Sequence, residues 1–180
     1  ALPIFLASSS KEVRRESCWL VSNIASGPPC QITELMKRKS IMQRLIASAK
    51  QDIWVVRKEA LWALASMCTS GDRTHAMSLV QADGFEPLVM VLSLENVEIA
   101  LLLTTLDAIR NVLEAHHQNL LLFQEHDGID YLEELQKHPS NNVYKKVCHL
   151  IEDYFGVEDE GAENLVPEIK KSGVYGFGIS

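Results

Sequence analysis

The chain has 180 residues, of which 47% are apolar, and a formal net charge of −7 at pH 7. This modest negative charge argues against general nucleic-acid binding, which needs a basic footprint. No apolar run approaches the roughly 20 residues of a membrane span and no signal peptide is recognisable, so we expect a soluble intracellular protein without membrane contact.

The first predicted helix, residues 13–24, carries a sequence motif (the repeated phrase) that recurs in residues 56–67. The two copies read VRRESCWLVSNI and VRKEALWALASM, and they place Trp19 and Trp62 43 residues apart. Self-similarity at a period of about 40–47 residues is typical of armadillo and HEAT helical arrays, which present a long surface to a partner. The repeat therefore indicates binding rather than catalysis.

Two fainter copies follow at residues 101–112 and 143–154, with Asp107 and His149 at the tryptophan position. Positions that stay apolar across the four copies lie on one stripe of a helix. They are Val13, Val56, Leu101 and Val143; Leu20, Ala63, Ala108 and Leu150; Val21, Leu64, Ile109 and Ile151; and Ile24, Met67, Val112 and Tyr154. We predict that this stripe is buried between neighbouring repeats.

Turn residues separate these helices at corresponding points. Gly27-Pro28-Pro29 and Ser70-Gly71-Asp72 end the first two copies. Asp83-Gly84-Phe85 and Asp127-Gly128-Ile129 form a second matched pair, whose glycine we interpret as a helix C-cap. Each repeat is thus predicted to be a short helix, a second helix and the long helix with the phrase. Because no stretch alternates like a strand, we predict an all-α, right-handed armadillo solenoid.

Both ends of the chain depart from the repeat. Residues 1–6 match residues 86–91, in the middle of a unit, so we expect a piece of a longer solenoid: three full repeats preceded by the third helix of a truncated one. Residues 152–180 carry a net charge of −5. We therefore predict armadillo repeats over residues 1–157 and an acidic, flexible tail over residues 158–180.

The sequence contains no motif that predicts an enzyme active site, a metal site or a cofactor site. The chain contains no GxxxxGK[ST], GxGxxG or GxSxG motif. His116 and His117 are adjacent and point about 100° apart on a helix, so they cannot share a metal as an i, i+4 pair could. The four cysteines show no CxxC spacing and are predicted to be reduced.

One face of the repeated helix combines aromatic and polar side chains. Glu16, Trp19 and Asn23 share one side of the first copy, and the second copy offers Glu59, Trp62 and Ser66. Two tryptophans on stacked helices can hold the stem of a lysine or arginine between them, while a glutamate takes its charge. An Asn can bind the backbone of an extended peptide. The alternative is that both tryptophans are simply core residues.

These motifs resemble those of the importin-α (karyopherin-α) family. The likeness lies in VRRESCWLVSNIASG, VRKEALWALASMCTSG and VYKKVCHLIEDYFGVEDE, followed by Leu165-Val166-Pro167-Glu168, and it covers essentially the whole chain in order. The resemblance implies the seventh to tenth repeats of a nuclear import adaptor that shuttles between cytoplasm and nucleus. Such a chain would hold most of the minor groove for nuclear localization signals. It would lack the major groove and the amino-terminal segment that binds importin-β.

The peptide-binding residues that the resemblance implies are Glu16, Trp19, Ser22, Asn23, Glu59, Trp62 and Ser66, with Ser26 as a further contact at the rim. Ser66 stands where the family usually has Asn, so we expect a Ser66→Asn change to tighten peptide binding. In the third copy Asp107 replaces Trp and Thr104 replaces Glu. Signal recognition should therefore be confined to the first two copies.

The last unit offers a second surface. Its outer positions are predicted to include Tyr131, Glu134, Tyr144, Lys145 and His149. In the family this region meets the CAS-type exportin that returns the adaptor to the cytoplasm. Two alternatives stay open: a module that grips a folded partner by the outer surface of its last repeats, and a catenin-type scaffold. The catenin groove is lined by basic residues, whereas glutamates beside tryptophans favour basic ligands.

Overall fold

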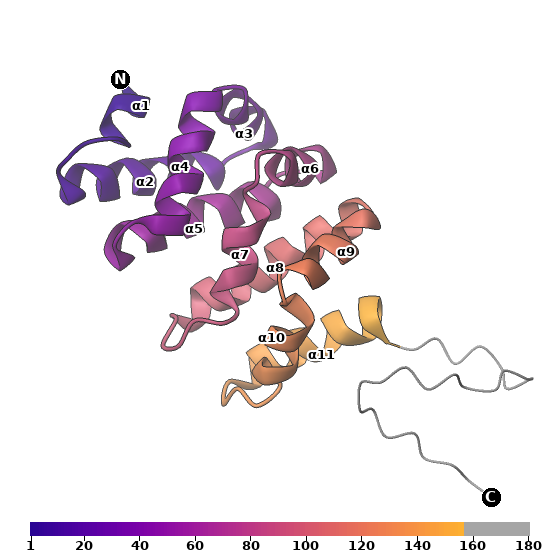
Figure 1. Cartoon of the computed structure of the whole chain (residues 1–180). Coiled ribbons are helices and arrows are strands. Elements are labelled where there is room, and N and C mark those ends of the chain that lie inside the picture. Colours follow the sequence, from indigo (N-terminus) through magenta and orange to yellow (C-terminus); the bar gives the residue numbers. More distant parts are fainter. Residues whose placement is uncertain (157–180) are drawn as a thin grey trace, which may run out of the picture.

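A computed structural model describes residues 1–156, and within that range it contains helices and no strands (Figure 1). The predicted all-α class is confirmed. The predicted acidic tail, residues 158–180, lies outside the described residues. The helices are α1 (Leu2–Phe5), α2 (Lys11–Ala25), α3 (Pro29–Met36), α4 (Lys39–Gln51), α5 (Trp54–Thr69), α6 (Arg73–Gln81), α7 (Phe85–Val91), α8 (Ile99–Ala115), α9 (Gln118–Glu125), α10 (Gly128–Leu135) and α11 (Asn141–Phe155).

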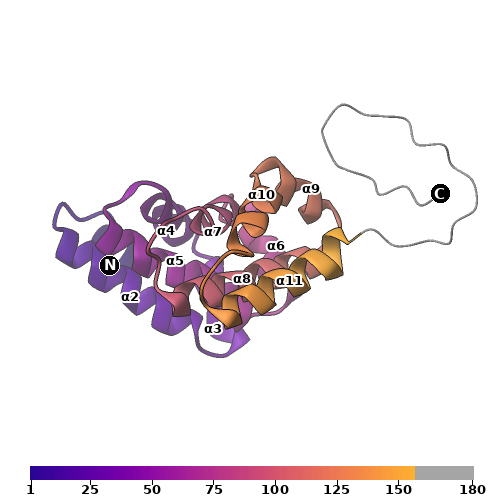
Figure 2. The ribbon, with the colours of Figure 1, turned by 90° about the horizontal axis from the view of Figure 1, so that it is seen from below.

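These helices form three-helix units that stack along one direction. The complete units are α3–α5, α6–α8 and α9–α11, and α1 and α2 precede them as part of another. The long third helices α2, α5, α8 and α11 pack in succession, each against the next, and lie along one side of the molecule (Figure 2). The repeated phrases are therefore brought to equivalent places on neighbouring helices.

The predicted apolar stripe is buried wherever a helix has neighbours on both sides. Val56, Leu64 and Ile109 have no exposed surface. In α2, the first helix of the row, Val13 is 38% exposed and Leu20 is 47% exposed. The same sequence position is thus core in one repeat and surface in another, because burial depends on whether a neighbouring helix covers it.

The first arginine of the repeated phrase ties α2 to Ser8 and to Asp52 of the next repeat, and ties α5 to the end of α4. Arg14 donates from Nε and Nη2 to the two carboxylate oxygens of Asp52, at 2.7 and 2.8 Å, and from Nη1 to the Ser8 carbonyl at 2.8 Å. Arg57, the equivalent residue, donates to the Ala49 carbonyl at 2.8 Å. The guanidinium of Arg14 also lowers the pKa of Asp52. These carbonyls lie at chain turns, where a helix cannot supply their partners.

The matched Asp-Gly turns differ from the prediction. The left-handed residues are Asp83 (φ 60°) and Asp127 (φ 59°), and no glycine within residues 1–156 has a positive φ. Gly84 and Gly128 are required for a different reason. A Cβ at Gly128 would lie 2.5 Å from the Phe123 ring, and one at Gly84 would lie 2.6 Å from Leu79. The glycines permit close packing, and the aspartates make the turn.

The cysteines of the chain are unpaired, and two of them are deeply buried. All four cysteines are free, and burial raises the pKa of Cys18 and Cys68 to about 12, so both thiols stay protonated at neutral pH. Among residues 1–156, none of the helices is both long and apolar enough to span a membrane.

Candidate functional site

The predicted peptide-binding residues come together on α2 and α5. These two helices pack side by side, so the helix with Glu16, Trp19 and Asn23 lies next to the helix with Glu59 and Trp62. We call these five residues the tryptophan face. The phrase places them there because residues three and four apart share one side of a helix.

The two tryptophans differ in exposure. Trp19 is 52% exposed, which is unusual for so large an aromatic side chain and excludes a purely core role. Trp62 is half-buried and packs against the core. The core interpretation therefore holds in part for Trp62 and not for Trp19. The third tryptophan, Trp54, is 41% exposed at the start of α5, eight residues before Trp62 and outside the tryptophan face.

The carboxylates of the face are accessible to a cation. Glu16 is exposed and contacts the guanidinium of its neighbour Arg15. Glu59 is half-buried, and within residues 1–156 no ion pair engages it. Its neighbour Lys58 pairs instead with Glu98 on the next repeat, at 2.8 Å. A ligand cation could thus approach Glu59 without displacing a partner.

Two of the predicted serines are not on the surface. Ser22 is 9% exposed and its hydroxyl donates to the Trp19 carbonyl at 2.8 Å. Ser66 is 7% exposed and accepts a hydrogen bond from the Ser26 hydroxyl at 3.2 Å. Both residues belong to the contact between α2 and α5, because small hydroxyl side chains let the helices approach. Only Ser26, which is exposed, keeps a place at the rim.

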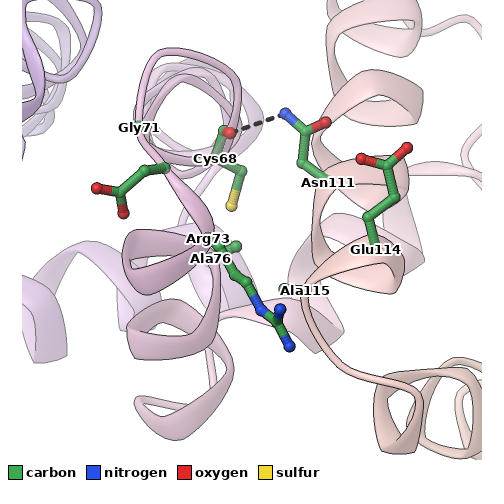
Figure 3. Close-up of a pocket in the computed structure, with 8 residues that line it drawn as sticks. Cys68, Gly71, Arg73, Ala76, Asn111, Glu114 and Ala115 are labelled. Carbon is green, nitrogen blue, oxygen red and sulfur yellow. Dashed lines mark hydrogen bonds between the residues drawn. The ribbon is translucent and has the colours of Figure 1, made fainter.

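The face changes character at α8. Asn111, at the position of Asn23, donates from Nδ2 to the Cys68 carbonyl at 2.9 Å and so joins α8 to the end of α5. Beside this bond lies a hollow of about 320 Å³, rimmed by Asp72, Arg73 and Glu114 (Figure 3). Sequence reasoning missed this hollow. Its only signal was the break at residues 70–72, which separates the two helices.

The predicted outer surface of the last repeat is only partly assembled. Tyr144, Lys145 and His149 are exposed on α11, and Glu134 is exposed on α10. Tyr131, however, is half-buried, with its hydroxyl 4.0 Å from the sulfur of Met90 in the preceding repeat. His149 stands at the tryptophan-equivalent position, on the row of third helices. Of the five residues, Tyr131 is therefore the least accessible.

No metal site is formed in the part of the chain that the structure describes. Residues 1–156 contain no group of three or more His, Cys, Asp or Glu side chains that could hold an ion. His116 and His117 lie between α8 and α9, with their rings stacked at 4.6 Å between centroids.

Solved structures similar to this chain share one fold. A designed armadillo repeat protein in complex with peptide (KR)4 matches with a TM-score of 0.72 and 28% identity, over 85% of this chain and 62% of that one. A second designed armadillo repeat protein has the same TM-score at 24% identity, over 85% of this chain and 63% of that one. The atypical Arm repeat family model matches residues 117–168. The chain is an armadillo-repeat protein.

Its curated relatives are importin alpha subunits. Importin subunit alpha-5 of Arabidopsis thaliana is 26% identical over 89% of this chain, and alpha-4 of the same plant is 28% identical over 83%. Importin subunit alpha-2 of Oryza sativa subsp. japonica is 26% identical over 88%. The chain is thus a relative of the importin alpha subunits, as its motifs predict, and spans about a third of their length: 32, 30 and 31%.

Proposed function

We propose that the chain binds lysine- and arginine-rich peptides of the nuclear localization signal type along its tryptophan face, as part of a nuclear import adaptor. The observation that carries this proposal is the half-exposed indole of Trp19 on α2, which packs against the helix that carries Trp62 and Glu59. Exposed apolar surface that is rimmed by polar residues often marks a site where a partner binds.

The chemistry of the face suits a basic side chain. The methylene stem of a lysine or arginine can lie against an indole while its charged head stays near water. The head gains a cation–π attraction of about 0.5–2 kcal/mol and ion pairing with Glu59 or Glu16. Asn23 is exposed and offers both a donor and an acceptor to the backbone of the peptide.

A similar protein supports this choice of ligand. The designed armadillo repeat protein at 28% identity was solved with the peptide (KR)4, which consists only of lysine and arginine. The importin alpha relatives connect the chain with nuclear import. Together they favour a basic peptide over a folded partner as the ligand of this face.

The test is a titration of fluorescently labelled (KR)4 followed by anisotropy. We expect saturable binding that weakens as salt rises, because charges at the surface are screened over about 8 Å at physiological ionic strength. Trp19→Ala should weaken binding roughly tenfold or more, as removal of a central aromatic contact usually does.

Trp54→Ala is the matched control, since Trp54 is also an exposed tryptophan but lies outside the face. It should leave the affinity unchanged. Equal losses in the two variants, or binding of a peptide with serine in place of every basic residue, would contradict the proposal.

The last repeat supports a second, separate contact. Tyr144 is 45% exposed on α11 and Leu121 is 60% exposed on α9, so apolar surface is available there. We propose that this end supplies only part of the surface on which a CAS-type exportin docks. A pull-down of the exportin with residues 1–180 should give weak or no binding while (KR)4 still binds. Strong exportin binding by this chain would show that the end is sufficient alone.

A further inference from the structure

Charges change sign along the row of third helices. Three residues before the tryptophan position, α2 and α5 carry Glu16 and Glu59, whereas α11 carries Lys146. At the tryptophan position itself, α8 carries Asp107. The last pair of helices therefore carries an acid in place of a tryptophan on α8, and a lysine in place of a glutamate on α11.

Asp107 and Lys146 contact one another across the space between α8 and α11. The Lys146 ammonium meets a carboxylate oxygen of Asp107. Their side chains are 45% and 38% exposed, so the pair lies at the surface of the row and not in the core. For Glu59 on α5 a ligand would have to supply such a cation, whereas here the chain supplies it.

Glu114, the other acidic residue of α8, is also bound by donors of the chain. Glu114 accepts hydrogen bonds from Arg110 Nε and from the Tyr154 hydroxyl of α11, both at 3.0 Å. Asp107 and Glu114 are the only acidic residues of α8. Both carboxylates are thus bound to donors of the chain itself, in contrast to Glu59 on α5.

We propose that Lys146 sets the end of the peptide footprint: it occupies Asp107 and repels basic ligand residues that extend past α5 toward α11. This inference rests on the proposed function of the tryptophan face. Its physical basis is that Lys146 already neutralises Asp107. A cation of the ligand therefore finds no free carboxylate there and meets the like charge of the Lys146 ammonium. The chain would accordingly bind a short basic segment, and further basic residues beyond that segment would not raise the affinity.

Peptide length makes the proposal testable. Packed helices lie about 8–10 Å apart, and an extended peptide advances about 3.3 Å per residue. Each helix of the row therefore corresponds to roughly three peptide residues. The peptide KRKR covers α2 and α5, and four further residues reach α8 and the edge of α11.

The experiment compares three labelled peptides, KRKRGSGS, GSGSKRKR and KRKRKRKR, on the chain and on Lys146→Glu. On the unaltered chain we expect the fully basic peptide to bind less than about threefold tighter than the half-basic ones. On Lys146→Glu we expect it to bind roughly tenfold tighter than they do, because Asp107 and the introduced carboxylate then accept its distal cations. Testing the basic half at either end avoids assuming a peptide direction.

Lys137→Glu is the matched control. Lys137 is also an ion-paired surface lysine of the last repeat, 3.0 Å from Glu134, but it lies beyond α10 and away from the row. It should leave the ratio between peptides unchanged. A Lys146→Glu ratio equal to that of Lys137→Glu, or a large ratio on the unaltered chain, overturns the inference while the proposed function stands. Failure of all three peptides to bind the unaltered chain overturns both.

Discussion

The two adjacent basic residues of the repeated phrase make different contacts. In VRRE and VRKE the first basic residue, Arg14 or Arg57, turns inward and binds carbonyls at the end of the preceding helix. The second, Arg15 or Lys58, contacts a carboxylate: exposed Arg15 that of Glu16, and half-buried Lys58 that of Glu98. The phrase thus combines an anchor for the fold with a face for a ligand, one residue apart.

Removal of the anchor should destabilise the chain. Arg14→Ala loses two charge-assisted hydrogen bonds to Asp52 and the bond to Ser8, and we expect the free energy of unfolding to fall by about 1–3 kcal/mol in urea denaturation at pH 7. Arg15→Ala, on the exposed neighbour, should change it by less than about 0.5 kcal/mol.

The contribution of this anchor should depend on pH in a defined direction. Arg14 holds the pKa of Asp52 below its usual value of 3.8. A carboxyl whose pKa is lowered on folding stabilises the folded state above its unfolded pKa and loses that effect as pH falls through its folded pKa. The difference between the chain and Arg14→Ala should be full at pH 7 and shrink below about pH 4. A difference that grows as the pH falls would contradict this assignment.

A single methyl group should disturb the second Asp-Gly turn. Gly128→Ala would place its Cβ 2.5 Å from the Phe123 ring, and overpacking of this kind costs about 1–3 kcal/mol. Gly27→Ala is the control, because its Cβ would meet mainly the flexible end of Gln31. Thermal unfolding of both variants checks this. Equal melting temperatures would mean that the ring moves aside freely.

At the scale of helices, the contact between α2 and α5 shows what sequence patterns can and cannot predict. The period of the phrase predicts that the long helices pack in register, and Trp19 is exposed beside Glu16 as their spacing indicates. The burial of Ser66 was not predictable from α5 alone, because it depends on Ser26 of the neighbouring helix. The ion pair of Lys146 with Asp107 was missed for the same reason.

This burial reverses the expectation for Ser66→Asn. Ser66 is 7% exposed and hydrogen-bonded to Ser26, so a larger amide would strain the contact between α2 and α5. We now expect the affinity for (KR)4 to change less than about twofold and the stability to fall by about 1–3 kcal/mol.

Asn23→Ser makes the reciprocal change at the exposed equivalent position on α2. It should weaken peptide binding with little loss of stability. A Ser66→Asn variant that binds more tightly, by the equivalent of one hydrogen bond or about 0.5–1.5 kcal/mol, would show that the peptide reaches position 66 after all.

At the scale of the molecule, the same stacking that builds the core defines the binding surface. Each unit buries its stripe against the next, so a continuous row of third helices is left along one side of the molecule, where we propose that the peptide binds. The sequence was sufficient to predict this row, because its period is long and regular. It could not predict where the row stops accepting cations, since that depends on contacts such as Lys146 with Asp107 between units.

The most direct test of the central claim uses the three tryptophans, Trp19, Trp54 and Trp62, which give three indole N–H signals in a ¹H–¹⁵N spectrum of the labelled chain. Single Trp→Phe variants assign the signals. On titration with (KR)4 we predict that the signals of Trp19 and Trp62 move together and saturate at one affinity, while that of Trp54 stays in place. Movement of the Trp54 signal alone, with Trp19 and Trp62 unchanged, would contradict peptide binding along the tryptophan face.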